Sequence, residues 1–166
     1  TLTKLANFNN TNPLLVPAPQ NVNDSPVLID GKLWFTCEKG GTNAVGSLST
    51  FDIATNTVSV ALSFDNNTGQ TPKSSPVVDG DLLYITTIGS TSGSIYSTLF
   101  KFNRVTDAFD GKLWEAASGT NPAARSPWGG VTVIDRGPNG KDLYFNTYSG
   151  GTPSNGTIQR YQTDTG

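Results

Sequence analysis

The chain of 166 residues contains no histidine, no methionine and a single cysteine, Cys37. One cysteine excludes an intrachain disulfide, and the lack of histidine removes the commonest general base and metal ligand. No run of eighteen apolar residues occurs, so the sequence predicts no transmembrane helix. The 11 basic and 13 acidic residues are spread singly, for a net charge of -2. We therefore expect no nucleic-acid partner and no membrane insertion.

Charged residues make up only 14% of the chain, against about 25% in an average soluble domain. Threonine, serine, asparagine and glycine fill the difference, while 35% hydrophobic and 10% aromatic residues still allow a core. The length fits a single domain. Because the sequence begins at Thr1 and has this neutral polar composition, we expect an exported protein, secreted or held at the cell surface, whose signal peptide has been removed.

The dipeptide Ser-Pro recurs with spacings of 50 and then 51 residues, at positions 25–26, 75–76 and 126–127. Each copy is followed by a short apolar strand, a turn and an aromatic-rich strand. A glycine-rich loop and a third strand come next, at 48–52, 99–103 and 157–162. The third copy carries about nine extra residues before its second strand, and we assign the segment from Ile134 to Lys141 to a lengthened hairpin loop.

A fourth strand ends only the first two repeats, at 58–64 and 112–116, because the third repeat stops at Gly166. The N-terminal segment 2–8 resembles the end of the first of these strands. A four-stranded repeat of about 50 residues without helical periodicity is typical of a β-propeller blade, and propellers close by completing the last blade with the first strand. We predict an all-β protein of three four-stranded blades, in which the N-terminal strand completes the third.

Three blades do not close a ring, because propellers typically have 4 to 8. Two copies would give six blades, with each N-terminal strand either returning to its own third blade or crossing into the partner's. Alternatively, the chain is one stretch of a longer tandem array that supplies further blades. We favour the dimer, and we divide the half-propeller domain 1–166 into an outer strand and linker at 1–23 and blades at 24–73, 74–124 and 125–166.

The repeat units contain Leu-Tyr-x-Thr-Thr, a Gly-Gly loop, a Gly-Thr-hydrophobic strand and a final Ser-Phe. The segments concerned are 83–87, 143–151, 156–161, 99–102 and 62–64. In these features the chain resembles the tandem-repeat propellers of the GloVer type, and it departs from them at 34–37 and 128–130. Kelch and quinoprotein-type repeats share the strand followed by Gly-Gly. The resemblance to the GloVer type implies an exported or surface-attached protein and no particular activity.

Residues that break the repeat are the candidates for a binding site. Glu38 and Tyr148 occupy the position after the second strand that Ile88 fills in the second repeat. Both lie beside a Gly-Gly pair, in a loop that we expect to face a ligand. The aromatic residues at 34, 84 and 144 instead share one repeat position, which we expect to pack against the next blade.

The third Ser-Pro is flanked by two further repeat-breaking residues. Trp128 stands where we align the valines that follow the other two dipeptides, and Arg125 replaces an aspartate and a serine. The structural alternative is that Trp128 packs over its neighbouring glycines and that Arg125 pairs with a surface acid. Because an aromatic ring packs well against the apolar face of a sugar, these residues predict a ligand-binding role.

The carboxylates and Cys37 do not predict a catalytic centre. Asp30, Asp79 and Asp110 each precede glycine in a predicted hairpin turn, and no two remaining acids share a motif spacing. Cys37 aligns with threonines in a strand, so we expect it to be buried. We therefore predict no catalytic residue, no metal site and no cofactor.

Three Asn-x-Ser/Thr sequons lie in predicted turns or loops, at Asn9, Asn66 and Asn155. In a secreted eukaryotic protein such sequons accept N-glycans. We expect a non-enzymatic propeller that binds a glycan or a surface protein through loops on one face. The alternatives are a propeller enzyme, such as a polysaccharide lyase or hydrolase or a quinone-type oxidoreductase, with its site in the central channel, and a structural unit that forms fibres.

Overall fold

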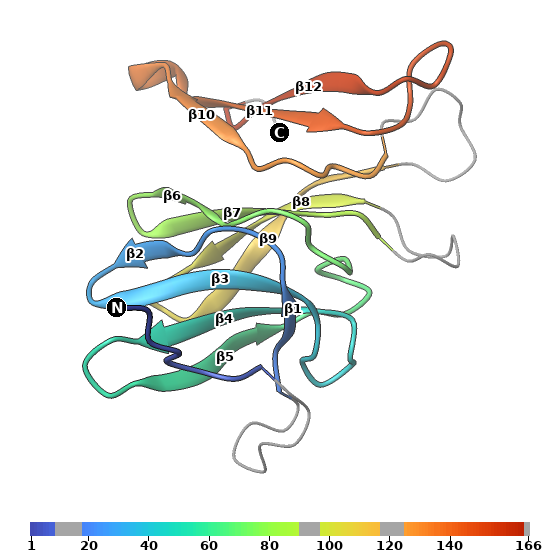
Figure 1. Ribbon diagram of the computed structural model, residues 1–166. Coiled ribbons are helices and arrows are strands. Elements are labelled where there is room, and N and C mark those ends of the chain that lie inside the picture. Colours follow the sequence, from blue (N-terminus) through green and yellow to red (C-terminus); the bar gives the residue numbers. More distant parts are fainter. Residues whose placement is uncertain (9–17, 90–96, 117–124, 165–166) are drawn as a thin grey trace.

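The computed structural model describes residues 1–8, 18–89, 97–116 and 125–164. Apart from a 3-10 turn at Gly137–Asn139, the regular elements of these residues are strands, so the predicted all-β class is confirmed. The strands form three antiparallel sheets that follow one another along the chain. The sheets lie in a stack, with the second between the first and the third (Figure 1). No helix in the described ranges is long and apolar enough to cross a membrane.

The first sheet has the order β1-β3-β4-β5, and β2 also pairs with β3. Its strands are β1 (Gln20–Val22), β2 (Val27–Ile29), β3 (Lys32–Lys39), β4 (Ser47–Asp52) and β5 (Thr57–Ser63). β1 and β2 pair with opposite ends of β3, on either side of the first Ser-Pro. Proline has no N–H to give to a strand ladder, which suits an interruption at this edge of the sheet. β1 lies in the range that we expected to be an outer strand and linker.

The second sheet has the order β6-β7-β8-β9 and the third the order β10-β11-β12. Their strands are β6 (Val77–Asp79), β7 (Leu82–Thr87), β8 (Thr98–Asn103), β9 (Ala108–Glu115), β10 (Thr132–Asp135), β11 (Lys141–Thr147) and β12 (Thr157–Gln162). Residues 1–8 form no strand and contact the first sheet. The predicted return of an N-terminal strand to the chain's own third sheet is therefore wrong for this molecule, and its crossing into a partner stays a prediction.

Two hairpin turns show which glycines the backbone requires. Asp30 and Gly31 both have positive φ, 49° and 77°, as a two-residue turn between β2 and β3 demands. The expected turn at Asp110-Gly111 is wrong, because both residues lie inside β9. The preceding turn forms instead after Asn103, whose Oδ1 accepts hydrogen bonds from two backbone amides. Gly111, with φ 112°, lies beside a register shift between β8 and β9, where a bulge favours glycine.

The extra residues of the third repeat fall in two places. Five of them lengthen the β10–β11 hairpin, which gains one residue pair in its ladder and three residues in its loop. The loop, 136–140, is longer than its counterpart, as predicted, but Ile134, Asp135 and Lys141, which we assigned to it, lie in the strands. The other four, 128–131, precede β10, because Thr132 opposes Tyr144 as Val27 opposes Trp34. Our alignment of Trp128 with the valines of the other repeats is therefore wrong. Trp128 instead belongs to an insertion.

Two hydrophobic layers hold the stack together. Between the first and second sheets lie Trp34, Leu48, Phe64, Leu83, Ile85, Phe100 and Phe102. Between the second and third lie Tyr84, Leu99, Val131, Leu143 and Phe145. The aromatic residues at 34 and 84 thus pack against the next sheet, as predicted, whereas Tyr144 lies on the opposite face of β11 from Leu143 and Phe145.

Candidate functional site

Trp128 and Tyr148 form an exposed aromatic pair. Their ring centroids are 4.9 Å apart and their planes differ by 14°, so the rings are stacked. Trp128 is 56% exposed and Tyr148 is 66% exposed. The structure therefore brings together two residues that sequence analysis selected separately. We call this pair the aromatic platform.

Backbone hydrogen bonds hold the platform at the end of the third sheet. Tyr148 follows β11 directly, and its N–H donates to the Ser126 carbonyl at 2.9 Å. The Arg125 N–H donates to the Ser149 carbonyl at 2.9 Å, and the Ser149 N–H returns the bond at 3.2 Å. These bonds fix the start of the insertion beside the residue on which Trp128 stacks.

The insertion is also tied to the second sheet. The Thr86 hydroxyl, which is fully buried on β7, donates to the Gly129 carbonyl at 3.1 Å. A Cβ atom added at Gly130 would lie 3.4 Å from a Val77 methyl, so the chain passes close over the second sheet there. Trp128 is therefore held from both sides of its backbone, although its ring lies in solvent.

Arg125 adds a cationic group beside the platform. Its side chain is exposed, and among the described residues no carboxylate forms an ion pair with it. The alternative that Arg125 pairs with a surface acid therefore finds no support in the described ranges. A guanidinium group offers five N–H donors, which suit sugar hydroxyls or a carboxylate of a ligand.

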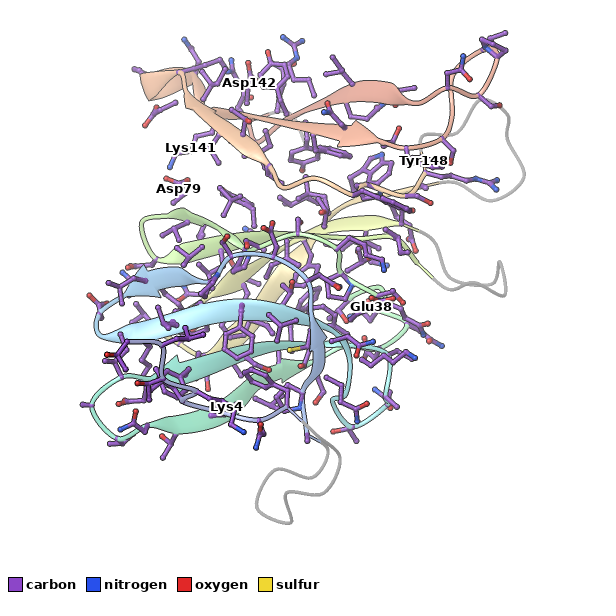
Figure 2. The ribbon with its side chains drawn as sticks, in the orientation of Figure 1. Lys4, Glu38, Asp79, Lys141, Asp142 and Tyr148 are labelled. Carbon is purple, nitrogen blue, oxygen red and sulfur yellow. The ribbon has the colours of Figure 1, made fainter. Side chains whose placement is uncertain are left out.

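Glu38 lies on the same side of the stack as Tyr148 but in the first sheet, inside β3 and not in the loop where we expected it (Figure 2). Its carboxylate accepts a hydrogen bond from Lys73 Nζ at 2.8 Å and another from Asn23 Nδ2 at 3.2 Å. The Lys73 contact, helped by Asn23, holds the pKa of Glu38 below its ordinary value, against the opposing effect of partial burial. Glu38 thus joins the first sheet to the segment before the second. Of the four candidate residues, Arg125, Trp128 and Tyr148 thus lie together at the platform, whereas Glu38 lies apart from them and pairs with Lys73.

Two groups of ion pairs involve the third sheet, and both lie away from the platform. Lys141 pairs with Asp79 of the second sheet, on the opposite side of the stack from Tyr148 (Figure 2). Arg136 pairs with the buried Asp142 at 2.9 Å and with Asp164 at 2.6 Å. Within the described ranges, no three carboxylate or cysteine side chains gather as metal ligands. These contacts fix the long hairpin to its neighbours.

Two of the three sequons lie among the described residues. Asn66 and Asn155 are exposed, in the loop after β5 and the loop before β12. The Asp65 carboxylate accepts hydrogen bonds from the amides of Asn67 and Thr68, which fixes the first of these turns. Asn9 lies outside the described residues.

Sequence reasoning missed the part that the insertion plays. The signal that could have found it is the run from Val131 to Ile134, which is rich in β-branched residues and begins three residues later after its Ser-Pro than the apolar runs of the other two repeats. Comparison of the chain with models of protein families, with curated proteins and with solved structures found no match. The resemblance to GloVer-type propellers therefore rests on the repeat alone.

Proposed function

We propose that the protein is an exported, non-enzymatic binding module that holds a glycan on the aromatic platform. The observation that carries this proposal is the exposed stacked pair, Trp128 on Tyr148, built on a backbone that the second and third sheets both fix. Large aromatic rings that stay exposed on a fixed backbone leave apolar area in contact with water, which is unfavourable for the free protein. A ligand that packs on the rings removes this area from water.

The chemistry of the platform suits a saccharide. Because the two rings stack on each other, each retains one free face on which the C–H face of a sugar ring can pack. Arg125 supplies hydrogen-bond donors for hydroxyl or carboxylate oxygens from the same end of the third sheet. A ligand of this kind needs no metal and no cofactor.

The same proposal includes the architecture around the platform. We read the three sheets as consecutive propeller blades. Apart from β1, the succession of neighbouring antiparallel strands β2 to β5 in the first sheet recurs as β6 to β9 in the second, and its first three strands recur as β10 to β12 in the third. A second copy would supply the other half of a ring of six blades, which lies within the usual range. The N-terminal segment would complete the partner's third blade, and export would expose Asn66 and Asn155 to glycosylation.

A glycan array probed with the labelled chain tests the binding role. We expect Trp128→Ala and Tyr148→Ala each to weaken binding to the selected glycan by about tenfold, which corresponds to the roughly 1.4 kcal/mol of one aromatic contact. Ile53→Ala is the matched control, because Ile53 is an exposed apolar residue, 47% accessible, in the turn after β4. Arg125→Gln should weaken binding most for acidic sugars.

Two results would contradict the proposal. One is a blank array at high protein concentration, in which case a pull-down with surface proteins tests the other ligand class. The other is glycan binding that neither Trp128→Ala nor Tyr148→Ala affects, which would place the site elsewhere.

A further inference from the structure

The outward face of the third sheet carries side chains of a kind that the other two sheets bury. Ile158 holds the register position in β12 that Leu48 holds in β4 and Leu99 holds in β8. Both leucines are fully buried, each against the next sheet, whereas Ile158 is 77% exposed. Tyr144, the counterpart of two buried aromatic residues, lies on the same outward face. This face is therefore half of an interface of the kind found twice inside the chain.

The outward face of the first sheet carries the other half. Leu28 holds the register position that Val78 and Val133 hold in the second and third sheets. Val78 packs into the layer between the first and second sheets, and Val133 packs into the layer between the second and third. Leu28 is 62% exposed. Each sheet thus presents one set of residues to the sheet before it and another to the sheet after it.

The N-terminal segment covers part of this first face. An apolar groove of about 200 Å³ runs between the sheet residues Leu33, Phe35 and Phe51 and the segment residues Leu5 and Phe8. Phe8 meets Phe35 edge to face, with ring centroids 5.4 Å apart. The cover is loose, because Leu5 itself is 60% exposed. Residues 1–8 therefore fill the place of a further sheet without burying it as completely.

We propose that a second copy of this chain packs the outward face of its third sheet onto the outward face of the first sheet. The stack continues across the two molecules as it does within one, and residues 1–8 leave the groove to admit the partner. This inference rests on the half-propeller architecture proposed above. It specifies which surfaces of the two copies form the contact. Around a two-fold axis, each copy contributes one face of each kind, so both open ends close.

Sedimentation velocity or light scattering over a concentration series measures the association. We expect Leu28→Asp and Ile158→Asp each to raise the dissociation constant of the dimer at least tenfold, because each places a carboxylate at a position that the layers inside the chain fill with a buried leucine or a packed valine. Val105→Asp is the matched control, since Val105 is 64% exposed in the turn after β8 and lies on neither face. All three sites are exposed, and thermal denaturation checks that each variant folds.

A mixing experiment distinguishes contact between unlike faces from contact between like faces. Leu28→Asp leaves the third-sheet face intact, and Ile158→Asp leaves the first-sheet face intact. We expect a mixture of the two variants to form heterodimers through one undamaged interface under conditions in which neither variant associates alone. If two like faces form the contact, mixing the variants gives no such heterodimers. A mixture without heterodimers would therefore overturn the proposed pairing of unlike faces.

The outcomes separate this inference from the proposed function. A wild-type chain that stays monomeric at every concentration overturns both the contact and the dimeric ring, and further sheets would then come from another source. A dimer that ignores both substitutions overturns the contact alone. A polymer that both substitutions abolish supports the contact and contradicts only the closed ring. Glycan binding at the platform is measured independently, because Trp128 and Tyr148 lie in the loops beside the third sheet.

Discussion

Cys37 shows how one buried residue limits the chemistry of the chain. It is fully buried on β3, and burial raises the pKa of its thiol to about 11, despite hydrogen bonds from Ser47 and Ser49 that oppose the shift. At pH 8 only about a thousandth of such a thiol is ionised, and the thiolate is the reactive form. We expect no labelling of the native protein by a thiol reagent at pH 8, and one equivalent after denaturation. Rapid labelling of the native chain would contradict this burial.

Glu38 links the first sheet, through Lys73, to the segment before the second sheet, and its pKa gives that link a pH dependence. The folded pKa lies below the ordinary value of 4.5, chiefly because Lys73 donates to the carboxylate. The stabilisation is therefore complete above pH 4.5 and is lost as the pH falls through the lower, folded pKa. Both side chains are about a quarter exposed, so Glu38→Gln should reduce the free energy of unfolding at pH 7 by only about 0.5 kcal/mol.

Denaturant unfolding at pH 7 and at pH 3 measures this effect. The difference between wild type and Glu38→Gln should shrink at the lower pH, where the wild-type carboxyl group is increasingly protonated. Glu115→Gln is the control, because Glu115 pairs with Lys112 inside one strand and is 40% exposed. An equal loss in both variants would indicate a general charge effect and not the contact between the first sheet and the segment before the second.

The site residues could be predicted as individuals but not as a group. Trp128 and Tyr148 stand out because they break the repeat, and both prove to be exposed and stacked. Their contact could not be predicted, since it depends on four inserted residues that our alignment placed elsewhere. Glu38 broke the repeat equally well, yet its carboxylate binds Lys73, a partner that lies 35 residues further along the chain.

At the scale of elements, a repeated hydroxyl contact joins each sheet to the segment that leads into the next. The Thr36 hydroxyl donates to the Ser74 carbonyl at 2.7 Å, and the equivalent Thr86 hydroxyl donates to the Gly129 carbonyl at 3.1 Å. Thr86 also shares a hydrogen bond with the buried Ser74 hydroxyl. The platform therefore depends on a strand of the neighbouring sheet.

Thr86→Val tests that dependence, because valine keeps the shape of threonine and removes its hydroxyl. The change leaves the Ser74 hydroxyl and the Gly129 carbonyl with fewer partners, so we expect a loss of about 1–3 kcal/mol in the free energy of unfolding. Glycan binding should weaken as well, because the insertion that carries Trp128 loses one anchor. Thr86→Ser, which keeps the hydroxyl, should retain binding, and its failure to do so would assign the effect to packing.

The strands themselves were the most predictable part of the fold. Apolar and aromatic residues recur with the Ser-Pro spacing, and the third strands form within a residue of the expected bounds. The Asp-Gly signal for a hairpin turn failed at one position, because glycine is favoured in β-bulges as well as in turns. Asp110-Gly111 has the composition of a hairpin turn, but the ladder uses Gly111 for a bulge and the turn falls after Asn103. Local composition does not separate a bulge from a turn, because both need positive φ.

At the scale of the whole molecule, the two ends of the stack differ in what covers them. The first sheet has a loose cover from residues 1–8, and the third sheet ends at β12 without a fourth strand among the described residues. When a second copy docks, residues 1–8 leave the groove. The predicted strand exchange then places them beside β12, where they form the fourth strand of a third sheet. The segment would then change from a side-chain contact to a backbone ladder.

Proline substitutions distinguish these two states of the segment. Thr3→Pro and Lys4→Pro leave Leu5 and Phe8, the residues that line the groove, unchanged. A proline cannot donate a ladder hydrogen bond, and consecutive residues direct their N–H groups to opposite sides of a strand, so one of the two variants must disrupt pairing with β12. We expect that variant to lower the melting temperature of the dimer and to speed amide exchange at β12. Thr3→Ala and Lys4→Ala are the matched controls. If both proline variants behave like their alanine controls, the segment does not join the third sheet.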